Sequence, residues 1–326
     1  MPELPEVETV VRGLRASLPG RAIRDVRLGK TDFIDDPIDL AKRLPGCRIT
    51  GITRVGKFIC LGLTSGGPVS AGFSGAALPE TFSGTVEPTL NAPPEESLHL
   101  VIHLGMTGQL TVRNPADQVA PHTHCFFALD DECELRYTDI RRFGRILLVP
   151  ESGIGVFRDQ LGAEPLEITL EEFRARFGTR RARVKALLLD QGVLRGVGNI
   201  YADESLFRAR IHPARIAASL AEEQIAALHR AVREILTAAI RLRGSSISDY
   251  VDCDGNRGEY QFRHRVYQRE SKPCVRCKEK IRRVIVAGRS SHFCPRCQPA
   301  PRLRKSRRKA IKKTKQRRAR SISKSN

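Results

Sequence analysis

No apolar run in this sequence approaches the roughly 18 residues that a membrane span needs. The N-terminus also lacks a signal-peptide pattern, so we expect a soluble cytoplasmic protein with no membrane partner. Without a secretory signal, the five scattered cysteines are expected to be reduced and packed: Cys47, Cys60, Cys125, Cys133 and Cys253.

Acidic residues are absent from the last part of the chain. Residues 302–326 contain 13 Lys or Arg and no Asp or Glu, so they carry +13 of the formal net charge of +20, and the preceding residues carry only +7. Basic proteins gain affinity for nucleic acid by releasing its counterions. We therefore expect a polyanionic partner, and we interpret residues 299–326 as a disordered basic tail.

The rest of the chain is long enough for two domains and a small third module. Apolar residues at helical spacing predict a helix over residues 3–18. Residues 64–97, rich in small residues and without an apolar period, predict a flexible insertion between two strands. The strand pattern itself predicts an antiparallel β-sandwich or barrel. Its eight short apolar segments are 22–28, 47–54, 57–63, 98–104, 108–113, 124–129, 133–138 and 145–149.

Helical periodicity replaces the strand pattern in the second half. Residues 151–158 are interpreted as a linker, because the Pro, Gly and Glu content rises there and the strand pattern stops. Helices are then predicted from Thr169, which begins a capping-box sequence, and over 184–191, 201–209, 222–242 and 246–251. The domains are accordingly a β-sandwich over 2–150, a helical domain over 159–262 and a cysteine module over 263–298.

The residues after Met1 combine a potential nucleophile with two acids. Removal of Met1 would leave Pro2 as a secondary amine, and chain-terminal amines titrate at about pH 8, well below lysine. Such an amine can attack an aldehyde-like carbon and form a Schiff base. Glu3 and Glu6 lie within one helical turn and could move protons. Alternatively, all three residues only begin a helix, whose first turn favours proline and acids.

Two turns carry apolar side chains that could enter a base stack. Met106 lies between Gly105 and Gly108, and Phe143 lies between an arginine pair and Gly144. Exposed apolar side chains of this kind kink DNA when they insert into a base step. The alternatives are a core methionine and a β-turn with a buried phenylalanine, but two such turns favour DNA bending.

Three further features have a structural and a functional interpretation. Residues 192–201 hold three glycines that allow close backbone approach, and Asn199 is predicted to cap the next helix, whose N-terminus suits a phosphate. Residues 244–262 form a polar loop suited to closing over a bound group, or else a plain connector. Lys57, at the start of a predicted strand, is on its own interpreted as a solvated edge residue.

Four cysteines have the spacing of a zinc site: Cys274-x-x-Cys277, sixteen residues, then Cys294-x-x-Cys297. The spacing favours zinc held by four thiolates, with iron as the alternative. This zinc would be structural, because four protein ligands leave no open coordination position. The intervening residues predict a β-hairpin with Arg289 at its tip, where it could contact the minor groove or a phosphate.

Taken in order, these motifs resemble those of the formamidopyrimidine-DNA glycosylase family. The resemblance implies an α+β protein with a β-sandwich, a helix–two-turn–helix domain and a zinc-finger hairpin. It further implies a monomer of the bacterial cytoplasm, associated with the nucleoid, that binds damaged double-stranded DNA and uses one structural Zn²⁺ and no redox cofactor. The matching pieces are Pro2 to Glu6, Gly56-Lys57-Phe58, His103 to Gly108, Asp139 to Gly144, Asp190 through Phe207, Ile211-His212-Pro213 and the cysteine module ending at Gln298.

The resemblance also implies a bifunctional glycosylase and abasic-site lyase for oxidised purines, such as 8-oxoguanine and formamidopyrimidines. Pro2 would attack the anomeric carbon, Glu3 would transfer protons and Glu6 would support the site. Lys57 would be the proton donor for β-elimination and Arg289 the proton donor for δ-elimination.

DNA contacts are implied as well. Met106, Arg141 and Phe143 would fill the gap left by the extruded base and contact the orphan cytosine. His122 would also contact DNA, and Asn199 and Arg289 would hold the flanking phosphates. The loop 244–262 would cap the extruded base, with Ser245, Ser246 and Tyr250 as its candidate residues.

Departures from the family pattern leave alternatives open. Besides the insertion and the tail, Ser248 and Arg243 stand where relatives often carry a basic residue and a glycine. An endonuclease VIII-like enzyme would share the mechanism but prefer oxidised pyrimidines, although Leu4 and the three wedge-forming residues favour purines. A non-catalytic zinc DNA-binding protein would explain the charge and the cysteines, but not the Pro-Glu start together with Lys57.

Overall fold

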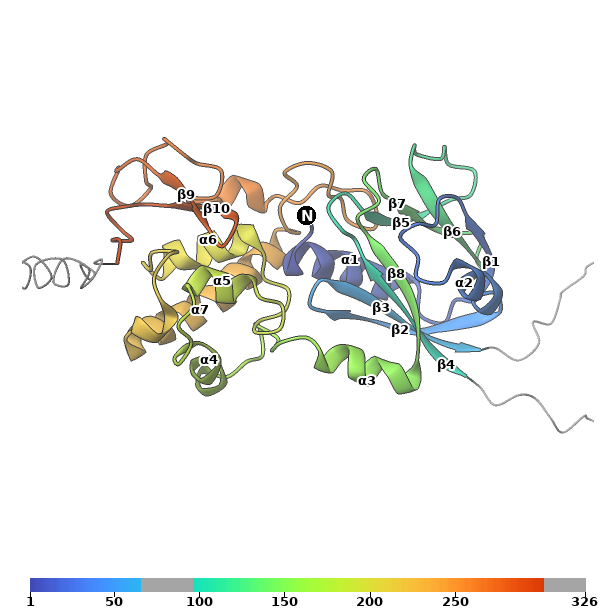
Figure 1. The fold of residues 1–326 in the computed structure, drawn as a ribbon. Coiled ribbons are helices and arrows are strands. Elements are labelled where there is room, and N and C mark those ends of the chain that lie inside the picture. The colour runs from blue at the N-terminus through green and yellow to red at the C-terminus, as the bar shows by residue number, and fades with distance from the viewer. Residues whose placement is uncertain (66–95, 302–326) are drawn as a thin grey trace, which may run out of the picture.

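Two antiparallel four-stranded sheets form the first half of the computed structural model, which describes residues 1–65 and 96–301 (Figure 1). Their strand orders are β1-β6-β7-β5 and β2-β3-β4-β8. All eight predicted strands are present, with ends within two residues of the prediction. They are β1 Ile23–Leu28, β2 Cys47–Val55, β3 Phe58–Ser65, β4 Ser97–His103, β5 Gln109–Arg113, β6 Thr123–Leu129, β7 Glu134–Thr138 and β8 Arg145–Pro150.

The predicted insertion and tail fall largely outside the described residues. Strands β3 and β4 remain paired as far as Thr64 and Ser97, so both ends of the predicted insertion belong to the sheet. The rest of the insertion, 66–95, and residues 302–326 of the tail lie outside the part of the chain that the structure describes.

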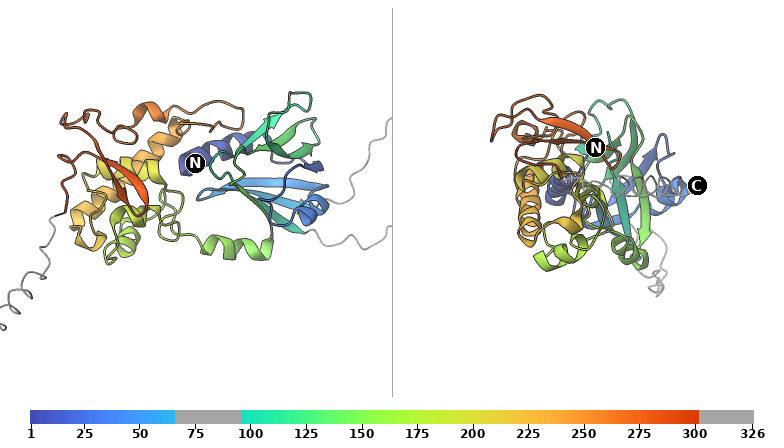
Figure 2. Two further views of the ribbon diagram at one scale, coloured as in Figure 1. Left: turned by 45° about the horizontal axis from the view of Figure 1, so that its top comes forward. Right: turned by 60° about the vertical axis from the view of Figure 1, so that its left-hand side comes forward.

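Both sheets and helix α1 (Leu4–Ser17) share one hydrophobic core, which confirms the predicted sandwich and N-terminal helix. Alternating strand residues point inward from each sheet, as in other sandwiches. The buried face of α1 follows helical spacing, with Val7, Val10, Val11 and Leu14 fully buried. Because α1 packs on the sandwich, its N-terminal end is held between the sheets and the helices that follow (Figures 1 and 2).

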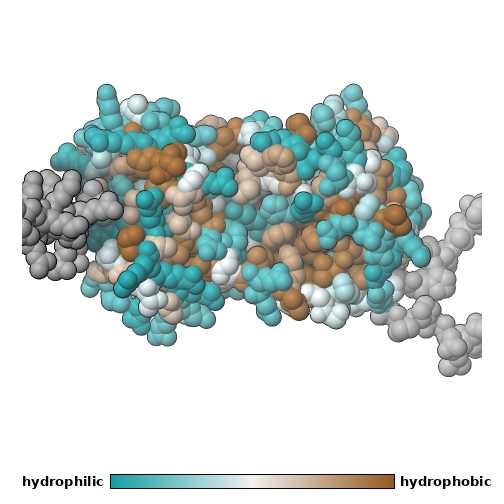
Figure 3. Space-filling model, viewed as in Figure 1, coloured by the Kyte–Doolittle hydropathy of each residue, from teal (hydrophilic) through white to brown (hydrophobic). Residues whose placement is uncertain are grey.

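The linker predicted over 151–158 is a helix, α3 (Glu151–Asp159). Its buried Ile154 joins a small core on the outer face of the second sheet, and Phe157 meets Phe58 edge-on at 5.0 Å between ring centroids. In Figure 3, hydrophobic residues are exposed among hydrophilic ones on the surface over the sheets. Covering this apolar face overrides the weak helix propensity of a segment with two glycines. A second short helix that the sequence did not predict, α2 (Pro37–Arg43), buries only Leu40.

Four helices and two 3₁₀ turns form the second domain: α4 Leu170–Phe177, α5 Val184–Leu189, α6 Asn199–Arg208, α7 Glu222–Arg241, η1 Ala217–Ser219 and η2 Tyr260–Arg263. The capping box at Thr169 and Glu172 is formed as predicted. The short helix predicted over 246–251 is wrong, because Ser246 Oγ donates to the carbonyl of Tyr250 and accepts from the N–H of Gly258. These side-chain bonds to the backbone compete with helix formation.

The last module is a β-hairpin of β9 (Arg282–Val286) and β10 (Arg289–Phe293). Ala287 and Gly288 both have positive φ, 51° and 72°, which suits a tight two-residue hairpin turn. Arg289 directly follows this turn, as predicted. No helix in the described part of the chain is both long and apolar enough to cross a bilayer.

Candidate active site and DNA-binding cleft

A cleft of about 710 Å³ lies between the sandwich and the helical domain, at the N-terminal end of α1. It brings together predicted site residues from five separate segments: Glu3, Lys57, Met106, Asn199 and Arg289. A small adjoining pocket of about 30 Å³ is lined by others, namely Pro2, Glu6, Ser245 and Tyr250, and shares Met106 with the cleft. His122, Arg141, Phe143 and Ser246 line neither space.

Glu3 is buried at the point where the two domains meet. Its carboxylate accepts hydrogen bonds from the N–H groups of Ile200, at 3.0 Å, and Tyr201, at 3.4 Å. The N-cap of α6 is Gly198, so the predicted cap by Asn199 is wrong. Glu3 supplies the acceptor that this helix end needs, and the carboxylate takes the place expected for a phosphate. Burial raises the pKa of Glu3, although Lys57 and the two N–H donors lower it.

Glu6 links three segments of the chain. Its Oε2 accepts from the N–H of Glu3 at 2.8 Å, and its Oε1 accepts from the N–H of Ser245 at 2.7 Å and from the hydroxyl of Tyr201. Burial and the neighbouring Glu3 raise the pKa of Glu6 to about 7. The N-terminus, α6 and the start of the loop 244–262 are therefore joined by one carboxyl group.

Lys57 is only 7% exposed, so the solvated-edge interpretation is wrong. It lies in the turn before β3, where Gly56 has a φ of 60° and approaches Arg195 and Gly196. Burial lowers the pKa of Lys57, while Glu3 and Glu6 raise it. An ammonium with a lowered pKa, facing a cleft beside two carboxyl groups, is suited to proton transfer.

The two predicted wedge turns pack against each other. Met106 is 40% exposed and Phe143 is 55% exposed, which rejects a core role for either. Asp139 is fully buried and accepts from Thr107 Oγ1 and the N–H of Gly144, which ties the two turns together. The guanidinium of Arg141 lies 4.5 Å from the centre of the Phe143 ring.

The exposed His122 lies close to these turns. Its carbonyl accepts from the N–H of Asp139 at 3.0 Å, and its φ of 66° places it in a tight turn before β6. The structure therefore holds His122 next to the wedge turns and outside the cleft.

Replacing Gly105 by Ala is expected to separate the wedge turns. Gly105 has a φ of 61°, and an added Cβ would clash with the backbone of Phe143 and Gly144. Strain in this backbone region costs about 1–3 kcal/mol, and we expect weaker binding to a duplex with an abasic-site analogue. The matched control is Gly20→Ala, since Gly20 has a φ of 89° but no atom within 4 Å of the added Cβ. Urea unfolding and fluorescence anisotropy measure both effects, and unchanged DNA binding by Gly105→Ala contradicts the expectation.

The three residues proposed to cap a base from the loop 244–262 are buried. Ser245 and Ser246 are 5% and 4% exposed, and Tyr250 is 7% exposed with its hydroxyl donating to the carbonyl of Glu6. Ser245 and Tyr250 fasten the loop to α1 through Glu6, and Ser246 holds the loop to itself, while Ile247 and Ser248 line the cleft.

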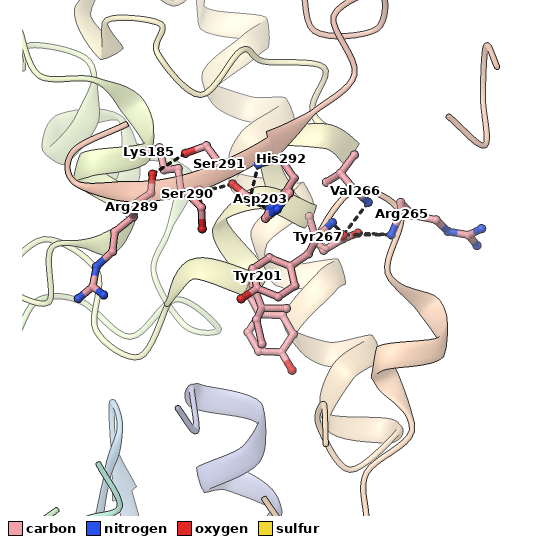
Figure 4. Close-up of polar contacts among 12 residues, drawn as sticks. Lys185, Tyr201, Asp203, Arg265, Val266, Tyr267, Arg289, Ser290, Ser291 and His292 are labelled. Carbon is pink, nitrogen blue, oxygen red and sulfur yellow. Dashed lines mark hydrogen bonds and ion pairs between the residues drawn. The ribbon is translucent and has the colours of Figure 1, made fainter. Parts of the chain in front are cut away.

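Arg289 lines the cleft and is positioned by a buried ion pair (Figure 4). Lys185 Nζ donates to Asp203 Oδ1 at 2.6 Å and to the carbonyl of Ser290 at 2.7 Å. Asp203 Oδ2 accepts from the N–H of His292 at 2.8 Å and from its Nδ1 at 3.1 Å. Helices α5 and α6 thereby hold strand β10 on both sides of Ser291.

The four module cysteines meet as predicted, with their sulfur atoms within 4.8 Å of one another. Sγ–Sγ distances are 3.4 Å between Cys277 and Cys294, 3.5 Å between Cys277 and Cys297, and 3.9 Å between Cys274 and Cys297. A tetrahedral zinc with Zn–S bonds of about 2.3 Å separates its thiolates by about 3.8 Å. The four sulfurs therefore fit one structural Zn²⁺, which would brace the hairpin that carries Arg289.

The sequence did not predict the partners that hold the site residues in place. Tyr201, Asp139, Lys185, Asp203 and His292 each bind a site residue or its neighbour. All of these except Lys185 lie inside the matching motifs, which is a weak signal for them. No local pattern indicates that Lys185 reaches Asp203 or that Asp203 reaches the hairpin, because these contacts join separate segments.

Three family models match the chain. They are the formamidopyrimidine-DNA glycosylase N-terminal domain over residues 1–146, the formamidopyrimidine-DNA glycosylase H2TH domain over 161–251, and the zinc finger found in FPG and IleRS over 271–300. A formamidopyrimidine-DNA glycosylase of Solibacter usitatus is 45% identical over 300 residues, covering 91% of this chain and 99% of the relative. A relative with the same description from Pelotomaculum thermopropionicum is 40% identical and also covers 91% of this chain and 99% of its own length.

Solved structures agree with these sequence relatives. Lactococcus lactis Fpg in complex with DNA containing an abasic site has a TM-score of 0.76 and 30% identity, covering 91% of this chain and 100% of that protein. MutM in complex with DNA containing carbocyclic 8-oxo-G has a TM-score of 0.76 and 31% identity, covering 92% and 100%. Domain order, fold and sequence identity over nine-tenths of the chain place it in the formamidopyrimidine-DNA glycosylase family.

Proposed function

We propose that this chain is a base-excision-repair DNA glycosylase with abasic-site lyase activity, which excises oxidised purines from duplex DNA. The observation that carries the proposal is that buried Glu3 and Lys57 line the cleft between the two domains, while buried Pro2 lines the small pocket that adjoins it. Enzymes with this substrate meet it on the chromosome, so we further propose that the protein works at the nucleoid of a bacterial cytoplasm.

Extrusion of the damaged base comes first, because its sugar cannot be attacked inside the duplex. Extrusion costs a few kcal/mol in lost pairing and stacking. Met106 and Phe143 are exposed on adjoining turns, so they can enter the vacated step, while Arg141 contacts the orphan base. Asn199 and Arg289 face the cleft and would hold the flanking phosphates of the bent strand.

Covalent catalysis follows from a free amine at Pro2. After removal of Met1, the Pro2 nitrogen attacks C1′, the glycosidic bond breaks, and the base leaves with the bonding electrons and a proton. Glu3 is placed to supply or accept that proton, since its raised pKa keeps it protonated to higher pH than an ordinary carboxyl. Glu6 fixes the backbone of Glu3 and thereby the position of the nucleophile.

Displacement of the base leaves Pro2 bonded to C1′ of a closed sugar ring. The nitrogen then loses its proton, the C1′–O4′ bond breaks and O4′ takes up a proton, which gives an iminium between Pro2 and C1′. Strand cleavage uses this iminium. The iminium makes the C2′ proton acidic, and its loss expels the 3′ phosphate in β-elimination, with Lys57 as the proposed proton donor. A second elimination expels the 5′ phosphate, with Arg289 as the proposed donor. Zinc, when bound to the four cysteines, supplies a structural crosslink that holds the Arg289 hairpin and takes no part in these bond changes.

Borohydride trapping on a duplex containing 8-oxoguanine tests the nucleophile. Wild-type protein is expected to form a covalent adduct that peptide mass spectrometry maps to Pro2, and the Pro2→Gly variant is expected to lose most of it. An undamaged duplex serves as the control. Retention of Met1 in active protein, or an adduct on another residue, overturns the assignment of Pro2.

The lesion class is tested by comparing excision of 8-oxoguanine and of thymine glycol from matched duplexes. We expect the purine lesion to be removed faster. A strong preference for thymine glycol contradicts the assignment to oxidised purines and favours an enzyme like endonuclease VIII.

A further inference from the structure

A second concave site lies at the opposite end of α6 from the cleft. Asn199 and Ile200, at the start of the helix, line the cleft, whereas Glu204, Phe207 and Arg208 line a pocket of about 570 Å³. At a rise of 1.5 Å per residue, the two ends of this helix lie about 14 Å apart. No residue lines both spaces, so the pocket is separate from the proposed catalytic site.

Apolar side chains from four segments form the base of this pocket. They come from α6, from α7 and the residue after it, from η2 and from the zinc module: Phe207, Ile235, Leu242, Tyr260 and Val275. Leu242 precedes the loop 244–262 and Tyr260 lies near its end, so both ends of that loop border the pocket. The volume lies within the range of sites that bind small molecules or an anchoring side chain.

Five arginines surround this apolar base: Arg208, Arg241, Arg263, Arg265 and Arg276. We call the whole site, base and rim together, the arginine pocket. Arg276 lies over the Phe207 ring at 4.4 Å and donates to the carbonyl of Phe207, and Arg208 pairs with Glu234. Within residues 1–65 and 96–301, the guanidinium groups of Arg241, Arg263 and Arg265 have no carboxylate within 4.0 Å.

The acid that lines the pocket does not balance these charges. Glu204 is 1% exposed, and its carboxylate accepts hydrogen bonds from the N–H groups of Arg265, Val266 and Tyr267 at 2.9–3.0 Å. Burial raises the pKa of Glu204 although these donors lower it. Its carboxylate is used to fix the backbone that carries Arg265, whose side chain points away from α6 (Figure 4).

We propose that the arginine pocket docks an acidic segment of a partner protein that carries a pair of bulky apolar side chains. Guanidinium groups bind carboxylates through paired hydrogen bonds, and arginine clusters recognise acidic motifs in this way. The apolar base selects against a plain nucleic-acid backbone, because phosphates and sugars offer nothing to fill the space beside Phe207 and Ile235. The proposal goes beyond the glycosylase function and stands or falls independently of it.

Anisotropy with a fluorescein-labelled octapeptide, a Leu-Phe pair flanked by six aspartates, tests the proposal on the full-length zinc-bound protein. We expect saturable binding that weakens at least about tenfold, or 1.4 kcal/mol, in an Arg241→Glu/Arg263→Glu variant. Both residues are exposed, so folding is not expected to depend on them. Arg233→Glu, an exposed charge reversal on the same helix that does not line the pocket, is the matched control and should retain binding.

Two further probes distinguish an acidic segment with an apolar pair from a purely acidic segment and from a nucleic acid. A peptide with Ser-Ser in place of Leu-Phe should bind about tenfold more weakly than the parent, because it cannot fill the apolar base. A labelled single-stranded octanucleotide should bind the double variant and the control variant equally. No saturable peptide binding, equal binding of the two peptides, or a loss confined to the oligonucleotide each overturns the proposal. Cleavage of lesion duplex by the double variant should equal wild type, which keeps this test distinct from that of the glycosylase function.

Discussion

Replacing Glu3 by Gln is expected to slow excision of 8-oxoguanine by about 10²- to 10⁴-fold, the usual contribution of a positioned acid or base. Glutamine keeps one carbonyl oxygen for the N–H of Ile200, the shorter of the two bonds, so the end of α6 stays capped there and only the longer bond from Tyr201 is given up. What is lost is the proton. Single-turnover excision, measured separately from strand cleavage, gives the size of the effect.

The pH dependence adds a second readout that a merely structural role of Glu3 would not change. Because burial raises the pKa of Glu3, its protonated form persists above the usual range of a carboxyl. Excision that needs this proton falls as pH rises through that pKa. The decline should be present in wild type and absent from the residual activity of Glu3→Gln.

A preformed abasic site and a second variant provide the controls. Base departure is already complete at an abasic site, so its cleavage should be much less affected by Glu3→Gln than excision is. Glu8→Gln is the second control, because Glu8 is an acid on α1 that lines neither the cleft nor the small pocket. Burial raises the pKa of Glu8, but Arg12 and Arg54 lower it by more, so Glu8 does not hold a proton as Glu3 does. The Glu8→Gln variant should excise 8-oxoguanine at the wild-type rate. Equal loss on both substrates, or normal excision by Glu3→Gln, contradicts the proposed role of Glu3.

The strands could be predicted because their signal is local. Side chains of each strand alternate between the core and the outside, and turn residues separate the segments. Helix α3 could not be predicted in this way. Gly153, Gly155 and the preceding proline indicate a linker, and only the apolar outer face of the second sheet, which Ile154 and Phe157 cover, stabilises a helix there.

The site was predictable as a set of residues and not as a geometry. The resemblance to the glycosylase family identified Glu3, Lys57 and Arg289 as site residues, and the structure brings all three to one cleft. Sequence reasoning placed a phosphate at the start of α6, where the structure has Glu3, because the domain contact that joins residues almost 200 positions apart leaves no periodic trace. Lys57 was assigned to a solvated edge for the same reason, since the residues that bury it come from other segments.

The buried pair of Lys185 and Asp203 supports the second large prediction. Both side chains are 0% exposed, and removing one partner leaves an uncompensated buried charge. Lys185→Met is expected to lower the free energy of unfolding by about 3–5 kcal/mol. Arg208→Met, which breaks an exposed pair with Glu234 at the end of α6, should lower it by no more than about 1 kcal/mol. Urea unfolding of the zinc-bound proteins measures both.

The same substitution should change the products, because Lys185 also holds the carbonyl of Ser290 next to Arg289. A looser hairpin places the Arg289 guanidinium less often at the second leaving phosphate, so β-elimination product should accumulate at the expense of δ-elimination product. A Lys185→Met/Asp203→Asn variant, which removes both charges, should regain part of the stability but not the product ratio, since the tie to Ser290 is still absent. Zinc content is measured in parallel, because loss of the metal would loosen the hairpin by another route. An unchanged ratio of products in folded, zinc-bound Lys185→Met contradicts the positioning role of Lys185.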